Sequence, residues 1–134
     1  MTLSVSQVRE QLADREAIGD VLYRYARAVD RCDEALLRGC YWEDAIDTHM
    51  VFEGKREEFL AWVMPSLRQF DATMHLIGNV LFSFHGDRAD VETYYYGYHR
   101  LKAEGPNGVQ RDVLGSGRYL DRFEKRNDEW RILT

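Results

Sequence analysis

The chain has 134 residues, long enough to bury a hydrophobic core without disulfides or metal ions, and 45% of them are hydrophobic, which excludes disordered and collagen-like classes. Its 18 basic and 23 acidic residues give a formal net charge of −5, and the basic residues do not cluster, so nucleic acid is excluded as the main partner. No apolar run approaches the roughly 20 residues of a membrane helix, and no export signal is recognisable, so we expect no membrane partner.

Helical periodicity dominates the first part of the chain. Apolar residues recur at spacings of three and four over residues 5–29 and predict a helix, with a break near Ala13 and Asp14. Asp33 is placed to cap a short second helix that Gly39 ends. A short segment over 44–50 follows, with Glu53 and Gly54 as the turn after it.

Residues 56–70 return to helical spacing, and Pro65 is expected to kink or restart that helix. The two cysteines, Cys32 and Cys40, are too few for a disulfide framework and are not spaced for a zinc site. A reducing cytoplasmic location is therefore expected.

From Thr73 onward the sequence is typical of strands. Runs rich in β-branched and aromatic residues cover 74–84, 89–101, 110–123 and 129–133, and turn signals separate them at 85–87, 105–108 and 126–128. Helices followed by an antiparallel meander predict an α+β fold: a cone-shaped curved sheet packed against the N-terminal helices, able to hold a ligand. No linker or repeat divides the chain, so one domain over 1–134 is expected, with a C-terminal tail expected after Thr134.

The histidines fall into two groups. His85 lies in a turn and His49 follows a short strand, so both are expected at the surface without a role. His75 and His99 lie inside strand-like runs, where a histidine is more often a core residue than a catalyst. Two imidazoles on neighbouring strands nevertheless favour acid–base chemistry, because imidazole exchanges protons near neutrality.

Asp30 ends an apolar helical face and is either a helix-end cap or a buried carboxylate that needs a partner such as histidine. Tyr25 lies five residues earlier, about 140° around an ideal helix, so the two converge on one pocket only if the helix bends or ends between them. Strand alternation places Tyr95 on one face with His99, and Tyr119 lies on the next strand. These tyrosines are either core aromatics or hydroxyl donors to a bound carbonyl.

Three motifs carry a family resemblance: Arg-Ala-Val-Asp30-Arg-Cys-Asp in the helix, Met74-His75-Leu-Ile-Gly in the first long strand, and Gly97-Tyr-His99-Arg-Leu in the second. In this order they resemble the SnoaL-like branch of the NTF2-like superfamily, and its scytalone dehydratase-like members in particular. The resemblance implies a cone-shaped α+β barrel, cofactor-free elimination chemistry and a homo-oligomer, either trimer or dimer.

The resemblance also implies roles for particular residues. Asp30 matches the helix-end aspartate, His75 the catalytic histidine and His99 a second histidine of the family. Tyr25 matches a tyrosine that some members carry five residues before the aspartate. Thr48 stands where scytalone dehydratase-like members carry a substrate-binding tyrosine. Tyr119 stands near a third-strand substrate-binding position.

The chemistry also follows from the residues themselves. Eliminating water or a halide β to a carbonyl requires a base on the α C–H, a donor for the enolate oxygen and an acid for the leaving group. His75 as base, a tyrosine such as Tyr95 as enolate donor and His99 as acid or orienter meet these needs, while Asp30 fixes one imidazole. The expected substrate is a small hydrophobic or aromatic carbonyl compound, without cofactor or metal. A facial iron site built from the two histidines and Asp30 is the metal alternative.

Two further function classes remain open. One is a non-catalytic small subunit of a ring-hydroxylating dioxygenase, and the other is a small-molecule-binding cone without turnover, because one fold hosts many functions. For the homo-oligomer, the residues of interest are Trp42, Trp62 and the outer face of Tyr94, Tyr96 and Tyr98, since exposed aromatic patches mark interfaces.

Overall fold

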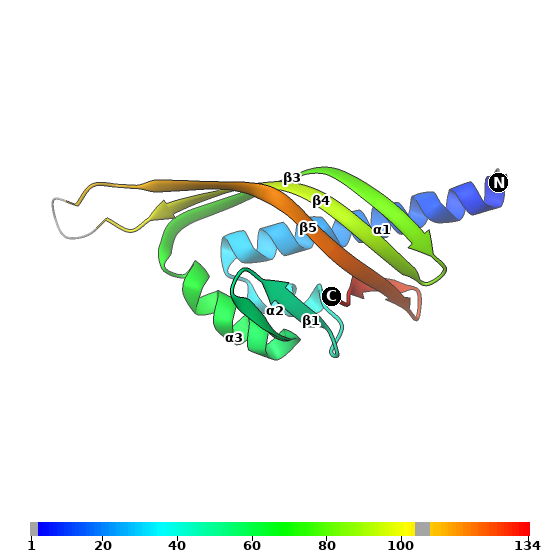
Figure 1. The fold of residues 1–134 in the computed structure, drawn as a ribbon, viewed down its shortest axis with the longest axis horizontal. Coiled ribbons are helices and arrows are strands. Elements are labelled where there is room, and N and C mark those ends of the chain that lie inside the picture. The colour runs from blue at the N-terminus through cyan, green and yellow to red at the C-terminus, as the bar shows by residue number, and fades with distance from the viewer. Residues whose placement is uncertain (1–2, 104–107) are drawn as a thin grey trace.

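The structure, a computed structural model, describes residues 3–103 and 108–134. A curved antiparallel sheet of four strands forms one layer, and the helices and a two-stranded hairpin lie on its concave side (Figure 1). The predicted α+β class, with N-terminal helices against a cone-like sheet, is confirmed.

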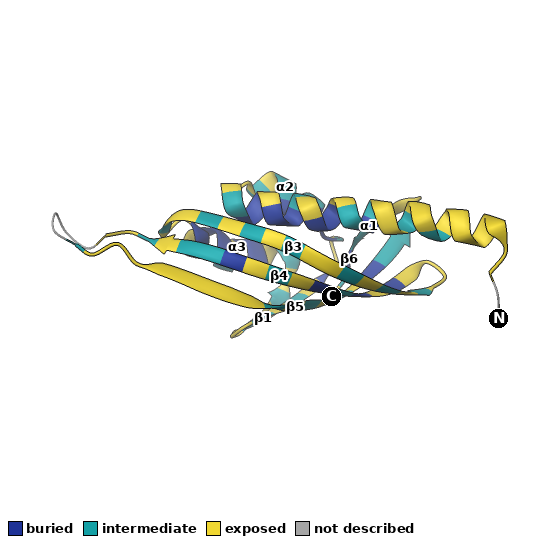
Figure 2. Cartoon of the chain, turned by 90° about the horizontal axis from the view of Figure 1, so that it is seen from above, coloured by how far each residue is buried: buried dark blue, intermediate teal, exposed yellow. Residues whose placement is uncertain are grey.

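Helix α1 (Val5–Arg31) begins at a capping box in which Ser4 and Gln7 bond reciprocally. It ends at Cys32 in the left-handed conformation, with the Asp33 N–H donating to the Ala28 carbonyl at 2.9 Å. Figure 2 shows exposed residues over the N-terminal turns and buried residues gathered in the C-terminal half. This end of α1 carries Asp30 to the sheet.

The predicted break at Ala13 and Asp14 is wrong, because α1 is continuous. Alanine has a high helix propensity, and the Asp14 carboxylate does not compete for its own backbone. It accepts hydrogen bonds from Lys125 Nζ at 3.1 Å and Trp130 Nε1 at 2.7 Å instead.

Helix α2 (Glu34–Gly39) has the predicted cap, since the Leu36 N–H donates to Asp33 Oδ1 at 3.0 Å. Strands β1 (Ile46–His49) and β2 (Phe52–Lys55) form the hairpin, so the turn falls on Met50 and Val51. The prediction of a turn at Glu53 and Gly54 is wrong. Gly54 serves close packing, because a Cβ there would lie 2.7 Å from the Phe52 ring.

Helix α3 (Arg56–Leu67) runs through Pro65 near its C-terminal end and stops three residues before the predicted end at 70. Phe70 instead starts the sheet. The strands are β3 (Phe70–His85), β4 (Arg88–Leu101), β5 (Asp112–Arg126) and β6 (Glu129–Ile132), in the order β3-β4-β5-β6. The predicted meander is confirmed, except that its turn at 105–108 falls mostly outside the described residues.

The register fixes which residues face the helices. His75 pairs with Gly97, Tyr95 with Gly117, and Thr93 with Tyr119. Cross-strand partners share a face, so these residues all lie on the concave side. The core lies between this side and the helices and includes Ile18, Val21, Leu22, Leu37, Phe59, Leu60 and Phe123. No helix within residues 3–103 and 108–134 is long and apolar enough to cross a membrane.

Candidate active site

Asp30 and His75 form a hydrogen-bonded dyad between the end of α1 and β3. Asp30 Oδ1 lies 2.7 Å from His75 Nδ1, and Oδ2 accepts the His75 backbone N–H at 2.9 Å. Both side chains are largely enclosed, with exposed fractions of 18% for Asp30 and 10% for His75. Two hydrogen bonds to one carboxylate fix the ring orientation and place a proton on Nδ1, so that Nε2 carries the free lone pair.

The charge of Asp30 is stabilised by this contact. Burial acts to raise the pKa of Asp30, but the side-chain and backbone hydrogen bonds from His75 outweigh burial and hold the pKa below its ordinary value of 3.8. Asp30 is therefore ionised at neutral pH. Its charge stabilises an imidazolium at His75 whenever Nε2 accepts a proton.

His99 lies beside His75 on the concave side. The centres of the two rings are 5.2 Å apart and their planes are nearly perpendicular, and the centre of the Phe70 ring lies 4.8 Å from that of His99. Burial lowers the pKa of His99, and the neighbouring His75 lowers it further. His99 is thus held neutral at pH 7, which suits a hydrogen-bonding and orienting role better than a resident acid.

Two tyrosines continue the wall from the histidines. Tyr95 lies 6.4 Å from the His75 ring and stacks on Tyr119 with ring centres 4.2 Å apart and planes within 5°. Gly117 makes room for this arrangement, because a Cβ there would lie 3.3 Å from the Tyr95 ring. Tyr25 meets Tyr119 edge-on at 5.6 Å. A row of aromatic rings therefore leads from the dyad into the cone.

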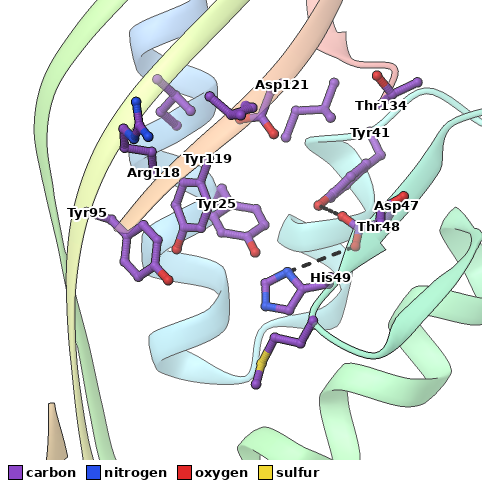
Figure 3. A pocket seen from close by; sticks show the side chains of 14 residues that line it. Tyr25, Tyr41, Asp47, Thr48, His49, Tyr95, Arg118, Tyr119, Asp121 and Thr134 are labelled. Atoms are coloured by element: carbon purple, nitrogen blue, oxygen red, sulfur yellow. Dashed lines mark hydrogen bonds and ion pairs between the residues drawn. The ribbon is translucent and has the colours of Figure 1, made fainter. Parts of the chain in front are cut away.

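A cavity of about 390 Å³ lies beyond this row. Figure 3 shows the hydroxyl groups of Tyr25, Tyr95 and Tyr119 pointing the same way, into the space beside His49. Burial raises the pKa of Tyr25 and of Tyr119, so both remain neutral hydrogen-bond donors. A concave site that combines aromatic walls with convergent polar groups is typical of a small-molecule site.

The dyad does not line this cavity. Asp30 and His75 border a separate hollow of about 350 Å³ between α1 and β3, shared with Tyr23 and Arg27. Of the predicted site residues, Tyr95 connects the dyad with the cavity. Its ring stacks on Tyr119 in the cavity wall and lies 6.4 Å from the ring of His75. Because α1 is continuous through both residues, Tyr25 and Asp30 lie on different sides of the helix: Tyr25 lines the cavity, and Asp30 lines the separate hollow.

Thr48 and His49 both differ from expectation. Thr48 borders the cavity but is exposed, and its neighbours Asp47 and His49 turn inward instead. His49 was predicted at the surface without a role; it is half-buried and lies against Phe59 at 5.8 Å. His85 is exposed as predicted.

Sequence reasoning missed a second polar cluster at the far end of the cavity, which comprises Tyr41, Asp47, His49 and Asp121. The Tyr41 hydroxyl donates to Asp47 Oδ2 at 2.8 Å, and His49 Nδ1 lies 4.0 Å from Asp47 Oδ1 (Figure 3). Burial raises the pKa of Asp121 to about 7, helped by the charge of Asp47. Burial also raises the pKa of Asp47, against the hydrogen bond from Tyr41.

The signals for this cluster were present in the sequence. Asp121 follows Tyr119 by two residues, so strand alternation places both on one face. Asp47 and His49 alternate with Thr48 in the same way, although alternation alone does not decide which of the two faces turns inward. Within the described part of the chain, no group of three or more His, Cys, Asp or Glu side chains is arranged to hold a metal ion.

No curated protein matches the sequence. Among solved structures, a scytalone dehydratase-like protein of Novosphingobium aromaticivorans is similar, with a TM-score of 0.80, 20% identity and coverage of 94% of this chain and 83% of that one. LinA is similar with a TM-score of 0.80 and 25% identity, covering 92% and 83%.

A third similar structure is hexachlorocyclohexane dehydrochlorinase LinA-type3 from Novosphingobium barchaimii, with a TM-score of 0.75, 20% identity and coverage of 92% and 84%. The helices and the curved antiparallel sheet therefore form an NTF2-like fold. The family model described as a SnoaL-like domain matches residues 10–134, nearly the whole sequence. The chain therefore belongs to the SnoaL-like family.

Proposed function

We propose that the chain is a lyase that eliminates water, or another leaving group, β to the carbonyl of a small cyclic or aromatic compound. The observation that carries this proposal is the Asp30–His75 dyad: both Nδ1 and the backbone N–H of His75 are bonded to one carboxylate. Nε2 faces Gly97 on the concave side, and no described residue hydrogen-bonds it. A base held in this way is ready to accept an α proton.

The proposed steps assign one task to each group. His75 Nε2 removes the α proton, and Asp30 stabilises the imidazolium that forms. The Tyr95 hydroxyl donates to the developing enolate oxygen, because Tyr95 is the residue that reaches from the cavity to His75. Collapse of the enolate expels the leaving group, which takes a proton from His75 while neutral His99 orients it. These reaction steps require no cofactor.

Relatives support the reaction class without fixing the substrate. A SnoaL-like family match and structural similarity to a scytalone dehydratase-like protein and to LinA-type dehydrochlorinase make an elimination enzyme the best-supported reading. The aromatic cavity supports a small hydrophobic substrate. Tyr25 and Tyr119 are proposed to pack against its ring, with Thr48 at the rim.

Proton abstraction can be tested without knowing the leaving group. We would incubate the enzyme in D₂O with 1-indanone, 2-tetralone and cyclic β-hydroxy ketones and follow loss of the α-proton NMR signal and release of water. The expected result is exchange or elimination with at least one of these ketones that His75→Asn reduces by about 10² to 10⁴. His85→Asn is the matched control, since His85 is an exposed histidine at the end of the same strand, β3. Equal rates in both variants would reject the proposal.

A binding cone without turnover is the second candidate. The observation that favours it is that the cavity reaches Tyr25 and Tyr119 but is not lined by Asp30, His75 or His99. The two candidates differ in one measurement: in a binding cone, ligand affinity persists and no carbonyl compound exchanges its α proton above the rate in buffer.

We also propose that the chain assembles as a homo-oligomer through the convex side of its sheet. Tyr94 and Tyr96 are exposed there, and Met74, Leu76, Leu114 and Leu120 are exposed beside them on the same side. Contiguous exposed apolar residues mark interfaces. Trp42 and Trp62 are not part of the proposed interface, because both make contacts within the chain. Arg126 and Arg131 lie over the Trp42 ring, and Trp62 stacks on Phe52.

A further inference from the structure

The far end of the cavity brings together carboxylates from two strands that are distant in the sequence. Asp47 comes from β1 and Asp121 from β5, and both line the cavity together with Tyr41 and His49 (Figure 3). We call these four residues the acidic end. The tyrosine row separates the acidic end from the Asp30–His75 dyad, and the proposed reaction makes no use of it.

The acidic end contains carboxylate oxygens without partners. Asp47 Oδ1 is buried and has no hydrogen-bond partner in the described chain, although Oδ2 accepts from Tyr41. The Asp47 side chain is only 12% exposed. Asp121 is enclosed as well, and none of the described residues hydrogen-bonds or ion-pairs with its carboxylate. Buried carboxylates are costly unless they are paired, so these oxygens call for a donor from a ligand.

Among the residues that the structure describes, no cationic side chain supplies that donor. Arg118 reaches the rim of the cavity, but it is paired with Glu92 at 3.0 Å and lies over Tyr94 on the convex side. The His49 ring nitrogen nearest Asp47 is 4.0 Å away, beyond hydrogen-bond distance. The acidic end is therefore rich in acceptors, and beside it stand the rings of Tyr25 and Tyr119.

We propose that the acidic end is a subsite for a hydroxyl group carried by the ring of the ligand, with Asp47 and Asp121 as hydrogen-bonding partners. The proposal deepens the proposed function and rests on it only in taking this ligand to be the substrate: a hydroxylated cyclic or aromatic carbonyl compound. A cavity of about 390 Å³ accommodates a compound of one or two rings. The tyrosine rings pack on its faces, and the hydroxyl reaches the carboxylates.

A hydroxyl fits better than an ammonium group. With a pKa of about 7, Asp121 is partly protonated at neutral pH and so both donates and accepts. A hydroxyl group also donates and accepts, whereas an ammonium only donates. A carboxylate on the ligand would be repelled by Asp47.

Binding of simple probes tests the subsite. We would measure dissociation constants for 4-ethylphenol, 4-ethylanisole and phenethylamine at pH 7 by NMR titration of the wild-type protein. Because the anisole carries a methyl group in place of the hydroxyl proton and so cannot donate, 4-ethylphenol is expected to bind about tenfold more tightly. Equal affinities for phenol and anisole would overturn the proposal. Tightest binding of phenethylamine would overturn it too, by showing an ammonium site.

Substitutions at two aspartates of β5 test whether Asp121 is responsible for the preference for the phenol. Asp121→Val should abolish the preference for phenol over anisole, and the control Asp112→Val, on the same strand but exposed and paired with Arg100, should retain it. Equal loss of the preference in both variants would contradict the assignment. Because the wild-type comparison needs no variant, misfolding of Asp121→Val does not remove the test.

The same probes separate this proposal from the proposed function. His85→Asn, at an exposed residue outside the cavity, should leave the affinity for 4-ethylphenol unchanged. A phenol preference without any proton exchange would support the subsite and reject the lyase. Proton exchange that depends on His75 without a phenol preference would do the reverse.

Discussion

Gly97 lies directly beneath the imidazole of His75: a Cβ at Gly97 would stand 3.3 Å from His75 Nε2 and equally close to His99 Cε1. An added methyl group would push both rings while leaving the strand intact. We expect Gly97→Ala to lower kcat by about tenfold or more, because small displacements of a base are costly. Gly115→Ala is the control, since nothing lies within 4 Å of its Cβ position. Equal kcat in both variants would show that the rings tolerate displacement.

The dyad should behave as one unit in a double-mutant cycle. Asp30→Asn keeps the shape but removes the charge that stabilises the imidazolium, so it should lower kcat/KM in the same direction as His75→Asn. Residues that act together are strongly non-additive, so the double variant should lose little more than the worse single one. Asp20→Asn, an exposed aspartate of the same helix, controls for the substitution. Fully additive losses would show that the two residues act separately.

Asp121 should make the protein less stable as pH rises. Its pKa is about 7 when folded and near 3.8 when unfolded, so between these values the unfolded chain gives up a proton that the folded chain keeps. The free energy of unfolding should therefore fall between about pH 4 and pH 7 and level off above pH 7. The fall should amount to roughly 1.4 kcal/mol for each unit by which the pKa of Asp121 in the folded chain exceeds its pKa in the unfolded chain.

Asp121→Asn should flatten this fall, as measured by urea unfolding at pH 4.5, 6 and 8. The titratable groups that interact with Asp121 are Asp47, Tyr25, Tyr41 and Tyr119, and of these only Asp47 shares its sign of pH dependence in this range. An unchanged pH profile in Asp121→Asn would place the effect on another residue.

A charged substitution on the convex side of the sheet tests whether this side forms the interface of the homo-oligomer. Tyr96→Glu places a carboxylate in the exposed apolar area and should convert the proposed homo-oligomer to monomer in light scattering at micromolar concentration. Tyr23→Glu, an exposed tyrosine of α1, serves as the control. A wild-type chain that is already monomeric would contradict the oligomer proposal.

The fold was largely predictable because its two periodicities are clear. The three-and-four spacing of α1 and the alternation in β3, β4 and β5 reflect one buried face each. The errors lie where tertiary contacts decide. Asp14 continues a helix because Lys125 and Trp130 bind its carboxylate, and Gly54 stands in a strand because Phe52 needs the space.

The candidate site was predictable in part. The pairing of Asp30 with His75 followed from the chemistry and the family resemblance, and the distance of 2.7 Å agrees with it. The phase of β1 did not follow, because Ile46 is apolar yet exposed and so suggests the opposite alternation, with Thr48 turned inward. The division between dyad and cavity was beyond sequence reasoning, since it depends on how the rings of Tyr95 and Tyr119 stack.

The Asp30–His75 contact joins residues 45 positions apart, whereas the hairpins of the sheet join neighbouring strands. Closing a long loop is slower than forming local pairs, so we expect α1 to dock on a sheet that local pairing has already assembled. The proton-accepting geometry of His75 is then among the last features to form during folding. A nascent or partly denatured chain that has its sheet but not its docked helix would carry His75 without the Asp30 carboxylate that orients it, and would lack the Leu22 and Tyr25 walls of the cavity. Such a chain would be chemically silent until the native state is complete.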